Sequence, residues 1–421
     1  MNGLAVPRLT ALQRPLAVLL LACAATHGAY QLGRAYFHPK QGLDLAPSYL
    51  AGRMCLAGGH DFFDDIRIGT LGASLGMHGP GGEAAPVLNF LYPPWVPALY
   101  APLSALPWGI ARRVWFLLST LMSGAALALT ARSFLPRDSC AFGTLAALGA
   151  AAFFFPLFYG LMTGQANDLL FFLVAGGLYL LARGRPLAAG AVFAPAFLWK
   201  PFLGIAVLFL LARREGKALL GLFVGAATLV AVSIGLGGAG AWLDWLRQIG
   251  LHNVLTSPEP RNHGLANAVL SLGLPPSLSP ALIWGLEGLV LVLLVLLLGP
   301  RTAPGGARYA LQLGGTLVAG VLLTPKAWEH YGVFLFPAFF AATVLSLEEG
   351  KTWPTATLGV CFSVWGLVLQ GHDEYVALTA TRLAPLVAVK TVAALALLGL
   401  AAWLVRRGPD QPSGEIGLPR R

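Results

Sequence analysis

The chain has 421 residues, of which 57% are hydrophobic and only 11% are charged. Ordinary soluble domains carry about 25% charged residues, and several apolar runs here reach the roughly 20 residues needed to cross a bilayer. This composition excludes an ordinary soluble protein. It predicts an all-α polytopic membrane protein whose residues 1–407 form one helical bundle.

The net charge of +10 comes largely from short clusters of Lys and Arg between the apolar runs. Such clusters are typical of membrane topology signals, so we expect no nucleic-acid partner. The four cysteines are scattered without a CxxC pair, which predicts neither a disulfide framework nor a metal site. We expect no cofactor, and a metal held by lone Asp or Glu side chains stays an open alternative.

In chain order, the apolar segments predict about 12 transmembrane helices. They cover residues 15–32, 110–131, 139–159, 168–182, 186–199, 201–212, 216–236, 280–299, 308–323, 331–346, 354–370 and 383–405. A cytoplasmic N-terminus places most basic clusters in the cytoplasm, as the positive-inside rule expects. The protein is then a multi-pass protein of the inner (plasma) membrane. Loops 33–92 and 237–279 face the periplasm or exterior, and residues 408–421 form a disordered cytoplasmic tail.

Residues 92–108, YPPWVPALYAPLSALPW, are apolar but rich in proline. If this segment crossed the membrane, most later basic clusters would move to the outside. We therefore predict a re-entrant or interfacial helix in the first external region, where protein covers its irregular backbone. A second full span is the alternative.

The segment 186–212 has basic residues at both ends and Lys200-Pro201 in its middle. The residue before a proline avoids helical geometry. The pattern predicts two short helices that form a hairpin with Lys200 at the apex, facing a polar cavity or a partner. A single kinked helix, with Lys200 reaching toward the membrane surface, is the alternative.

Polar side chains gather in the loops and span ends that this topology places on one face. They are Asp44, Asp61, Asp64, Asp65, Gln165, Asn167, Asp168, His252, Asn253, Arg261, Asn262, His263, Asn267, Lys326, Trp328, Glu329 and His330. Carboxylates, amides, imidazoles, aromatics and cations suit sugar hydroxyls and a phosphate. Their convergence predicts a site at the external membrane interface. Gln165 and Asn167 have an alternative role as caps of the next helix, and we assign Lys390 and Glu287 only a packing role.

Five segments occur in an order that resembles the GT-C superfamily of membrane glycosyltransferases, and within it glycosyltransferase family 87. They are GLDLAPSYLAGRMCLAGG, FLYPPWVPALYAPLSALP, GQANDLL, GRPLAAGAVFAPAFLWKPFLGIAVLFLLARR and LLTPKAWEHYGVFLFP. The resemblance implies a GT-C-type helical bundle. It also implies a polyprenyl-phosphate-sugar donor and an active site outside the cytoplasmic membrane.

The resemblance gives Asp44 the role of catalytic base, because GT-C enzymes keep an acidic residue just after the first span. Asp61, Asp64 and Asp65 are its rivals. Lys200 is the leading cation for the donor phosphate, followed by His330, Arg261 and Arg112. The remaining substrate-binding candidates are Tyr92, Gln165, Asn167, Asp168, Asn262, Trp328 and Glu329.

We therefore expect an inverting transfer of a sugar, with mannose leading, from a polyprenyl phosphate to a lipid-linked or cell-envelope glycan. The expected partners are this donor, that acceptor and membrane lipids. One alternative is an arabinosyltransferase that uses polyprenyl-phosphate-arabinofuranose. A transporter or a non-catalytic lipid-binding protein is the other, although an internal repeat typical of transporters is not evident.

Overall fold

The structure is a computed structural model that describes residues 13–38, 41–59, 61–75, 77, 90–252, 255, 257–259, 261–370 and 384–407. The predicted tail at 408–421 lies outside the described residues. Within these ranges the regular structure is helical, and an isolated antiparallel bridge joins Asn262 to Trp328. The predicted all-α class is therefore confirmed for the described part of the chain.

Most of the longer helices coincide with predicted apolar segments, whereas the helices Ala46–Leu56, Asp65–Ser74, Gly240–His252 and Leu265–Leu270 lie within the predicted external loops 33–92 and 237–279. In the first half they are α1 (Gln13–Phe37), α2 (Ala46–Leu56), α3 (Asp65–Ser74), α4 (Val96–Ser104), α5 (Trp108–Phe134), α6 (Arg137–Ala151), α7 (Phe155–Thr163), α8 (Asn167–Ala182), α9 (Pro186–Trp199), η1 (Pro201–Ile205) and α10 (Ala206–Ala212). In the second half they are α11 (Gly216–Gly237), α12 (Gly240–His252), α13 (Leu265–Leu270), α14 (Ser279–Leu298), α15 (Ala307–Leu323), η2 (Glu329–Leu335), α16 (Phe336–Glu349), α17 (Thr352–Leu367), η3 (Ala384–Ala388) and α19 (Val389–Arg407).

Five helices of the described chain are long and apolar enough to cross a membrane, or six if a bent pair counts as one span. This establishes a multi-pass membrane protein, whereas the expected number of about 12 crossings is not shown. Several apolar helices, such as α8 and α9, are shorter than the roughly 20 residues of a straight span. The predicted span 139–159 is two helices, α6 and α7, bent by 71° just before Pro156, where a proline disfavours a continuous helix.

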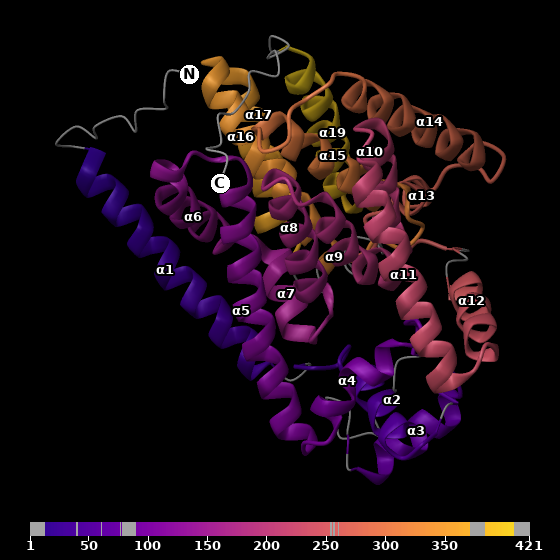
Figure 1. Cartoon of the computed structure of the whole chain (residues 1–421). Coiled ribbons are helices and arrows are strands. Elements are labelled where there is room, and N and C mark those ends of the chain that lie inside the picture. Colours follow the sequence, from indigo (N-terminus) through magenta and orange to yellow (C-terminus); the bar gives the residue numbers. More distant parts are fainter. Residues whose placement is uncertain are drawn as a thin grey trace.

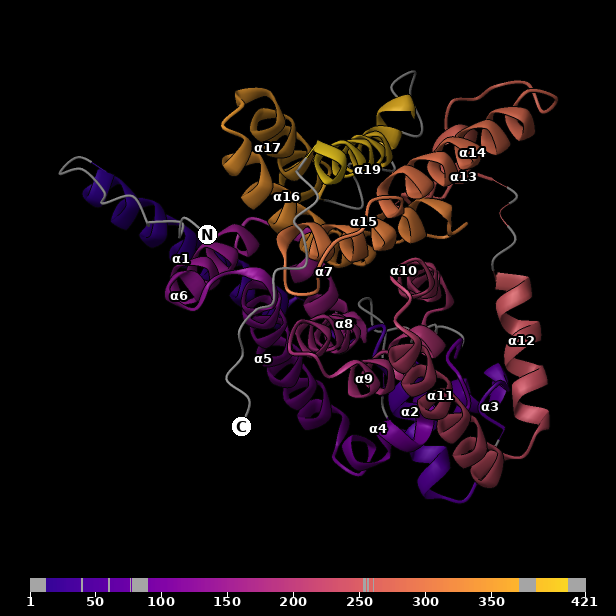
Figure 2. The same ribbon diagram turned by 45° about the horizontal axis from the view of Figure 1, so that its top comes forward.

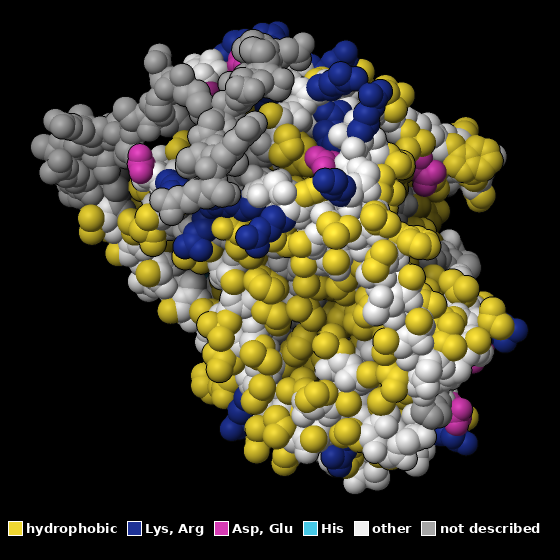
Figure 3. All heavy atoms as spheres, viewed as in Figure 1, with side chains coloured by type: hydrophobic (Ala, Val, Ile, Leu, Met, Phe, Trp, Pro, Cys, Tyr) yellow, Lys and Arg dark blue, Asp and Glu magenta, His cyan; other side chains and the backbone are white. Residues whose placement is uncertain are grey.

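Two views place the helices around one another. Figure 1 shows α1 slanting alongside α6 and α5, while α2, α3 and α4 lie together at the lower end. Figure 2 shows α14, α15, α16, α17 and α19 gathered on one side of the bundle and α5, α8, α9 and α11 on the other. The face shown in Figure 3 carries a broad hydrophobic belt, with most of its visible Lys and Arg above the belt and a few below it. This belt fits a bilayer environment.

The segment 186–212 forms the predicted hairpin. Glycines let α9 and α11 pack backbone to backbone, because a Cβ on Gly190 would collide with the carbonyl of Ala218. Further along the same pair, Ala194 contacts Gly225, so the two helices run parallel. The segment between them, η1 with α10, must therefore return toward the start of α9. Lys200, in an extended conformation (φ −123°, ψ 99°), lies at the turn.

The proline-rich segment folds as the short helix α4, packed on α2. Its nine residues reach about 14 Å, at 1.5 Å per residue, which is less than half of the hydrocarbon thickness. The hydroxyl of Ser104 donates to the carbonyl of Tyr49 (2.8 Å), and the hydroxyl of Tyr49 donates to the carbonyl of Leu106 (2.8 Å). These bonds satisfy polar groups of the segment inside the protein, as the prediction of a non-spanning helix requires.

Candidate active site

A cavity of about 550 Å³ lies where the turn before α2, the end of α7, the Lys200 hairpin and η2 meet. We call it the central cavity. It is lined by Asp44, Pro47, Leu91, Tyr92, Tyr159, Gln165, Trp199, Lys200, Pro201, Phe202, Ile249, Thr324, Lys326, Trp328, His330 and Tyr331. Seven of the residues predicted to converge or to bind substrate, drawn from five separate segments, therefore border one space: Asp44, Tyr92, Gln165, Lys200, Lys326, Trp328 and His330.

Asp44 is held in the turn Gln41–Leu45 against the end of α7. Its backbone N–H donates to the carbonyl of Thr163 (2.8 Å), and the N–H of Gly42 donates to that of Met162 (3.0 Å). The side chains of Gln165 and Thr163 hydrogen-bond its carboxylate. Burial raises the pKa of Asp44, and these two bonds and the positive charge of Lys200 only partly oppose the shift. A carboxylate with a raised pKa accepts a proton more readily, which suits a general base.

Gln165 is oriented by its neighbour across the cavity. The hydroxyl of Tyr92 donates to Oε1 of Gln165 (3.2 Å), which leaves the amide nitrogen to donate to Asp44. The ring of Tyr92 also meets that of Trp199 edge to face, with centroids 5.9 Å apart. Helix α8 begins at Asn167 without a side-chain cap. The capping alternative for Gln165 and Asn167 is therefore wrong, and Gln165 belongs to the wall around Asp44.

Lys200 brings a positive charge to the same cavity from the hairpin apex. Its side chain is 5% exposed, and its ammonium lies 4.1 Å from the centroid of the Tyr331 ring, a distance that permits a cation–π interaction. Among the described residues, no salt bridge within 4.0 Å joins Lys200 to Asp44. The two opposite charges thus face a common space without neutralising each other directly.

His330 presents an imidazole to the cavity between two tyrosines. Its ring stacks on Tyr159 (centroids 6.0 Å apart, 16° between planes) and meets Tyr331 edge to face (5.0 Å). Both ring nitrogens are buried without a hydrogen-bond partner among the described residues. Buried polar atoms are normally satisfied, so this imidazole is suited to bind a ligand.

Other predicted residues support the wall instead of lining it. The guanidinium of Arg261 donates to the hydroxyl of Tyr159 (2.7 Å), and Asn167 donates to the carbonyl of His330 (2.8 Å). Asp168 accepts a hydrogen bond from Ser123 (2.6 Å). The oxygen of the Asn262 side chain accepts from the N–H groups of Gly264 and Ala327. Arg261 and Asn167 thus act on the cavity through the lining residues Tyr159 and His330, whereas the hydrogen-bond partners of Asp168 and Asn262 do not line it.

Glu329 belongs to a separate, fully buried cluster behind the cavity. One of its carboxylate oxygens accepts from the ammonium of Lys390 (2.6 Å), and the other lies 2.9 Å from Nε2 of His263. Lys390 and His263 are 0% exposed, and Glu329 is 1% exposed. We call these three residues the buried charge cluster. They join η2, the loop before α13 and α19, the last of the described helices.

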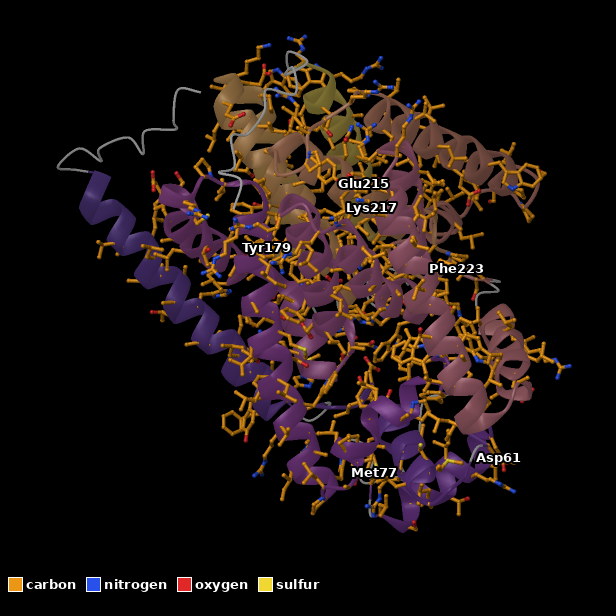
Figure 4. The ribbon with its side chains drawn as sticks, viewed as in Figure 1. Asp61, Met77, Tyr179, Glu215, Lys217 and Phe223 are labelled. Atoms are coloured by element: carbon orange, nitrogen blue, oxygen red, sulfur yellow. The ribbon has the colours of Figure 1, made fainter. Side chains whose placement is uncertain are left out.

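The acidic rivals of Asp44 lie on the surface of the lower region. Asp64 caps α3 by accepting from the N–H groups of Ile66 and Arg67, and Asp61 forms an exposed ion pair with Arg67. Figure 4 shows Asp61 at the lower right of the molecule, whereas Glu215 and Lys217 at the start of α11 lie in its upper half. Neither Asp61 nor Asp64 lines the central cavity, and the side chain of Asp65 is outside the described residues.

Arg112 lies in a different pocket from the other donor-phosphate candidates. That pocket is lined by Tyr36, Phe37, His38, Gln41, Arg112 and Arg113.

Three residues around the central cavity were not predicted from the sequence: Thr163, Tyr159 and Tyr331. Tyr159 and Thr163 lie just before the GQAND motif, and Tyr331 directly follows His330, so proximity to those motifs was the available signal. No group of three or more His, Cys, Asp or Glu within the described ranges is placed to hold a metal ion.

Comparison with known proteins identifies the family. The model of glycosyltransferase family 87 matches residues 90–325, more than half of the chain. This region includes Tyr92, Gln165 and Lys200, while Asp44 and His330 lie outside it. A relative from Mycolicibacterium smegmatis, a polyprenol-phosphate-mannose-dependent alpha-(1-2)-phosphatidylinositol mannoside mannosyltransferase, is 26% identical over 226 residues.

That alignment covers 50% of each protein, so the chain spans about half the length of the curated relative that it matches. No solved structure matches the chain significantly. The family match covers the helices from α4 to α15, which carry Tyr92, Gln165 and Lys200 of the central cavity. On that match, this multi-pass membrane protein belongs to glycosyltransferase family 87.

Proposed function

We propose that this protein is an inverting glycosyltransferase that moves mannose from a polyprenyl phosphate to a hydroxyl of a lipid-linked or cell-envelope glycan. Family membership supports glycosyl transfer, and the relative supports a polyprenyl-phosphate-mannose donor. The observation that carries the proposal is the shared cavity of Asp44, Lys200 and His330. The active site faces the periplasm or exterior, since the basic ends of the predicted spans lie opposite.

In this reaction, Asp44 is the general base. The acceptor oxygen attacks the anomeric carbon while Asp44 takes the hydroxyl proton. The bond between that carbon and the phosphate oxygen breaks, and the polyprenyl phosphate leaves with the electron pair. The raised pKa of Asp44 and its orientation by Gln165 and Thr163 support this role. General base catalysis contributes about 10²–10⁴-fold.

Lys200 and His330 bind the phosphate of the donor. As the phosphate leaves, it gains negative charge, which the ammonium of Lys200 stabilises. The imidazole of His330 supplies a hydrogen bond, and its unpartnered ring nitrogens support this assignment. Tyr92, Gln165 and Trp328 bind the sugar, because aromatic faces and amides suit its apolar faces and hydroxyls. Arg261 keeps Tyr159, and hence His330, in position.

The decisive assay uses the purified full chain in lipid nanodiscs. Synthetic polyprenyl-phosphate-mannose and polyprenyl-phosphate-arabinofuranose are offered with a panel of glycolipid acceptors, and products are identified by mass spectrometry. We expect mannosylated product with inverted anomeric configuration, and transfer by Asp44→Asn that is slower by about 10²–10⁴-fold. Preference for arabinofuranose would reassign the sugar. Retained configuration, or full activity of Asp44→Asn, would contradict the mechanism.

A further inference from the structure

A second pocket, of about 370 Å³, lies between the end of α1 and the start of α5. We call it the α1–α5 pocket, with the lining residues given above. The two helices meet beside it, because the rings of Tyr36 and Phe116 are in edge contact with centroids 5.4 Å apart. The described ion pairs include neither Arg112 nor Arg113. Two guanidinium groups therefore enter this pocket without a carboxylate from the described residues.

The pocket also holds buried donors without acceptors. Gln41 is 7% exposed, and its amide nitrogen has no hydrogen-bond partner among the described residues. The Nε of Arg112 is likewise buried and unpartnered. Leaving such a donor unsatisfied costs about 1–3 kcal/mol, so an acceptor from outside the chain would stabilise the site. Paired guanidinium groups favour phosphate, whose oxygens accept bidentate hydrogen bonds.

The apolar surroundings indicate that this phosphate is carried by a lipid. Phe37, which lines the pocket, is 82% exposed. Above it, α1 and α5 present apolar side chains outward, with Tyr30 59% and Leu117 59% exposed. An occupant can therefore place a charged group between the arginines and acyl chains along this apolar surface. Basic pockets beside membrane helices suit anionic lipid head groups in this way.

The pocket is joined to the central cavity through one turn. Gln41 lines the α1–α5 pocket, and Asp44 of the same turn lines the central cavity. Between them Gly42 has φ +79°, and a Cβ there would lie 3.3 Å from Trp108 and 3.4 Å from Cβ of Arg112. The turn thus packs directly on the helix that carries the two arginines. A group bound to Gln41 and Arg112 would hold this turn in place.

We propose that the α1–α5 pocket binds the phosphodiester head group of an anionic lipid, separately from the donor phosphate, and so steadies the turn that carries Asp44. The effect on catalysis rests on the proposed function, whereas lipid binding does not. Arg112 and Gln41 are positioning residues here, since they act on the reaction through Asp44.

Native mass spectrometry of the detergent-purified full chain tests binding. Phosphatidylglycerol, phosphatidylcholine and inorganic phosphate are titrated separately and in competition. We expect tight binding of phosphatidylglycerol, weaker binding of the zwitterionic lipid and little competition from inorganic phosphate. The double variant Arg112→Gln/Arg113→Gln should bind phosphatidylglycerol about 10- to 100-fold more weakly. The matched control Arg183→Gln/Arg185→Gln, which removes two exposed arginines elsewhere, should bind as wild type does.

Two further measurements keep the proposal falsifiable. Gln41→Leu preserves both guanidinium groups and should weaken the binding of phosphatidylglycerol about 2- to 10-fold. If the double variant does not fold, this variant alone tests whether the α1–α5 pocket binds the lipid. In nanodiscs, phosphatidylglycerol should raise kcat of wild type but not of the double variant, with the KM for the donor unchanged.

Unaltered lipid binding by the variants would overturn the proposal, as would displacement of the lipid by equimolar phosphate. A raised donor KM with intact lipid binding would return Arg112 to the donor site and also overturn it. Wild-type protein that binds phosphatidylglycerol but transfers no sugar would refute the proposed function and leave the lipid site standing.

Discussion

The central cavity and the buried charge cluster contain the same kinds of side chain in opposite states. In the cluster, Glu329 contacts both Lys390 and His263, and all three are closed off from solvent. In the cavity, Asp44 and Lys200 face a shared space without a direct ion pair. Paired charges in a protein interior satisfy one another and hold structure together. Charges that remain apart around a cavity are available to a substrate.

The comparison explains why two adjacent residues have different surroundings. Glu329 and His330 are neighbours in the 3₁₀ helix η2, yet the carboxylate faces Lys390 and the imidazole faces the central cavity. The cluster therefore anchors the segment from behind while His330 is presented in front. We expect substitutions in front to change activity and substitutions behind to change stability.

The largest expected effect is at Asp44. Asp44→Asn keeps the size of the side chain but removes the base, so kcat should fall about 10²–10⁴-fold while thermal unfolding stays near that of wild type. Asp64→Asn is the matched control, because asparagine also caps helices and this residue is on the surface. Transfer rates of the two variants check the expectation. Equal losses in both would break the distinction between cavity and surface carboxylates.

Next is the closed cluster. Lys390→Met leaves the Glu329 carboxylate buried without its ammonium, which typically costs about 3–5 kcal/mol. The expected result is a large loss of thermal stability in detergent. Adding Glu329→Gln to Lys390→Met should recover part of that loss, because the uncompensated charge is gone. If the double substitution recovers nothing, or Lys390→Met is as stable as wild type, the cluster does not stabilise the bundle.

A smaller effect is expected at Lys200. Lys200→Gln removes the cation but keeps a polar side chain, and kcat/KM for the donor should fall about 10- to 100-fold. Donor titration should show both a raised KM and a lowered kcat, because Lys200 binds the donor phosphate and stabilises its charge as it leaves, and the unfolding temperature should be little altered. An unchanged donor KM would remove Lys200 from the phosphate site. A stability loss as large as that of Lys390→Met would place Lys200 with the structural charges.

The smallest effect concerns pH. The pKa of Asp44 is raised above its ordinary value of 3.8 by burial, and the carboxylate is the working form of a base. Activity should therefore increase with pH along an acid limb that lies above pH 3.8. It should decrease at lower pH, because the Asp44 carboxylate becomes protonated there. The profile of kcat/KM against pH measures this limb. Asp44→Glu, which retains a carboxyl group, should keep a limb, whereas the residual activity of Asp44→Asn should lack it.

Much of the bundle could be predicted because its signals are local. Apolar runs gave the helix positions, and proline before or within them gave the Lys200 turn and the short α4. The bend between α6 and α7 was missed, although Pro156 marks it. Which helices cross the membrane was predicted less well than where the helices lie, since hydrophobicity alone does not distinguish a crossing helix from one buried in the bundle.

The site could be predicted only in part, because which side of a wall a residue faces depends on contacts far apart in sequence. Lys200 was singled out as a cation before a proline in an apolar segment, whereas Asp44 and His330 were assigned from the resemblance to family 87, and all three line the central cavity. Glu329 was assigned to substrate because its partner Lys390 lies 61 residues away, and periodicity gave no hint of that pair. Arg112 was assigned to the donor, although the fold turns it toward Gln41.

The attachment of η2 to α19 also affects how the protein is made. Lys390 lies 61 residues after Glu329, so the segment that carries His330 receives its ionic anchor only after α19 has been synthesised. Until then Glu329 has no ammonium from α19 beside it. The η2 segment therefore gains this contact after the residues that line the central cavity have been synthesised, because all of them precede α19 in the chain.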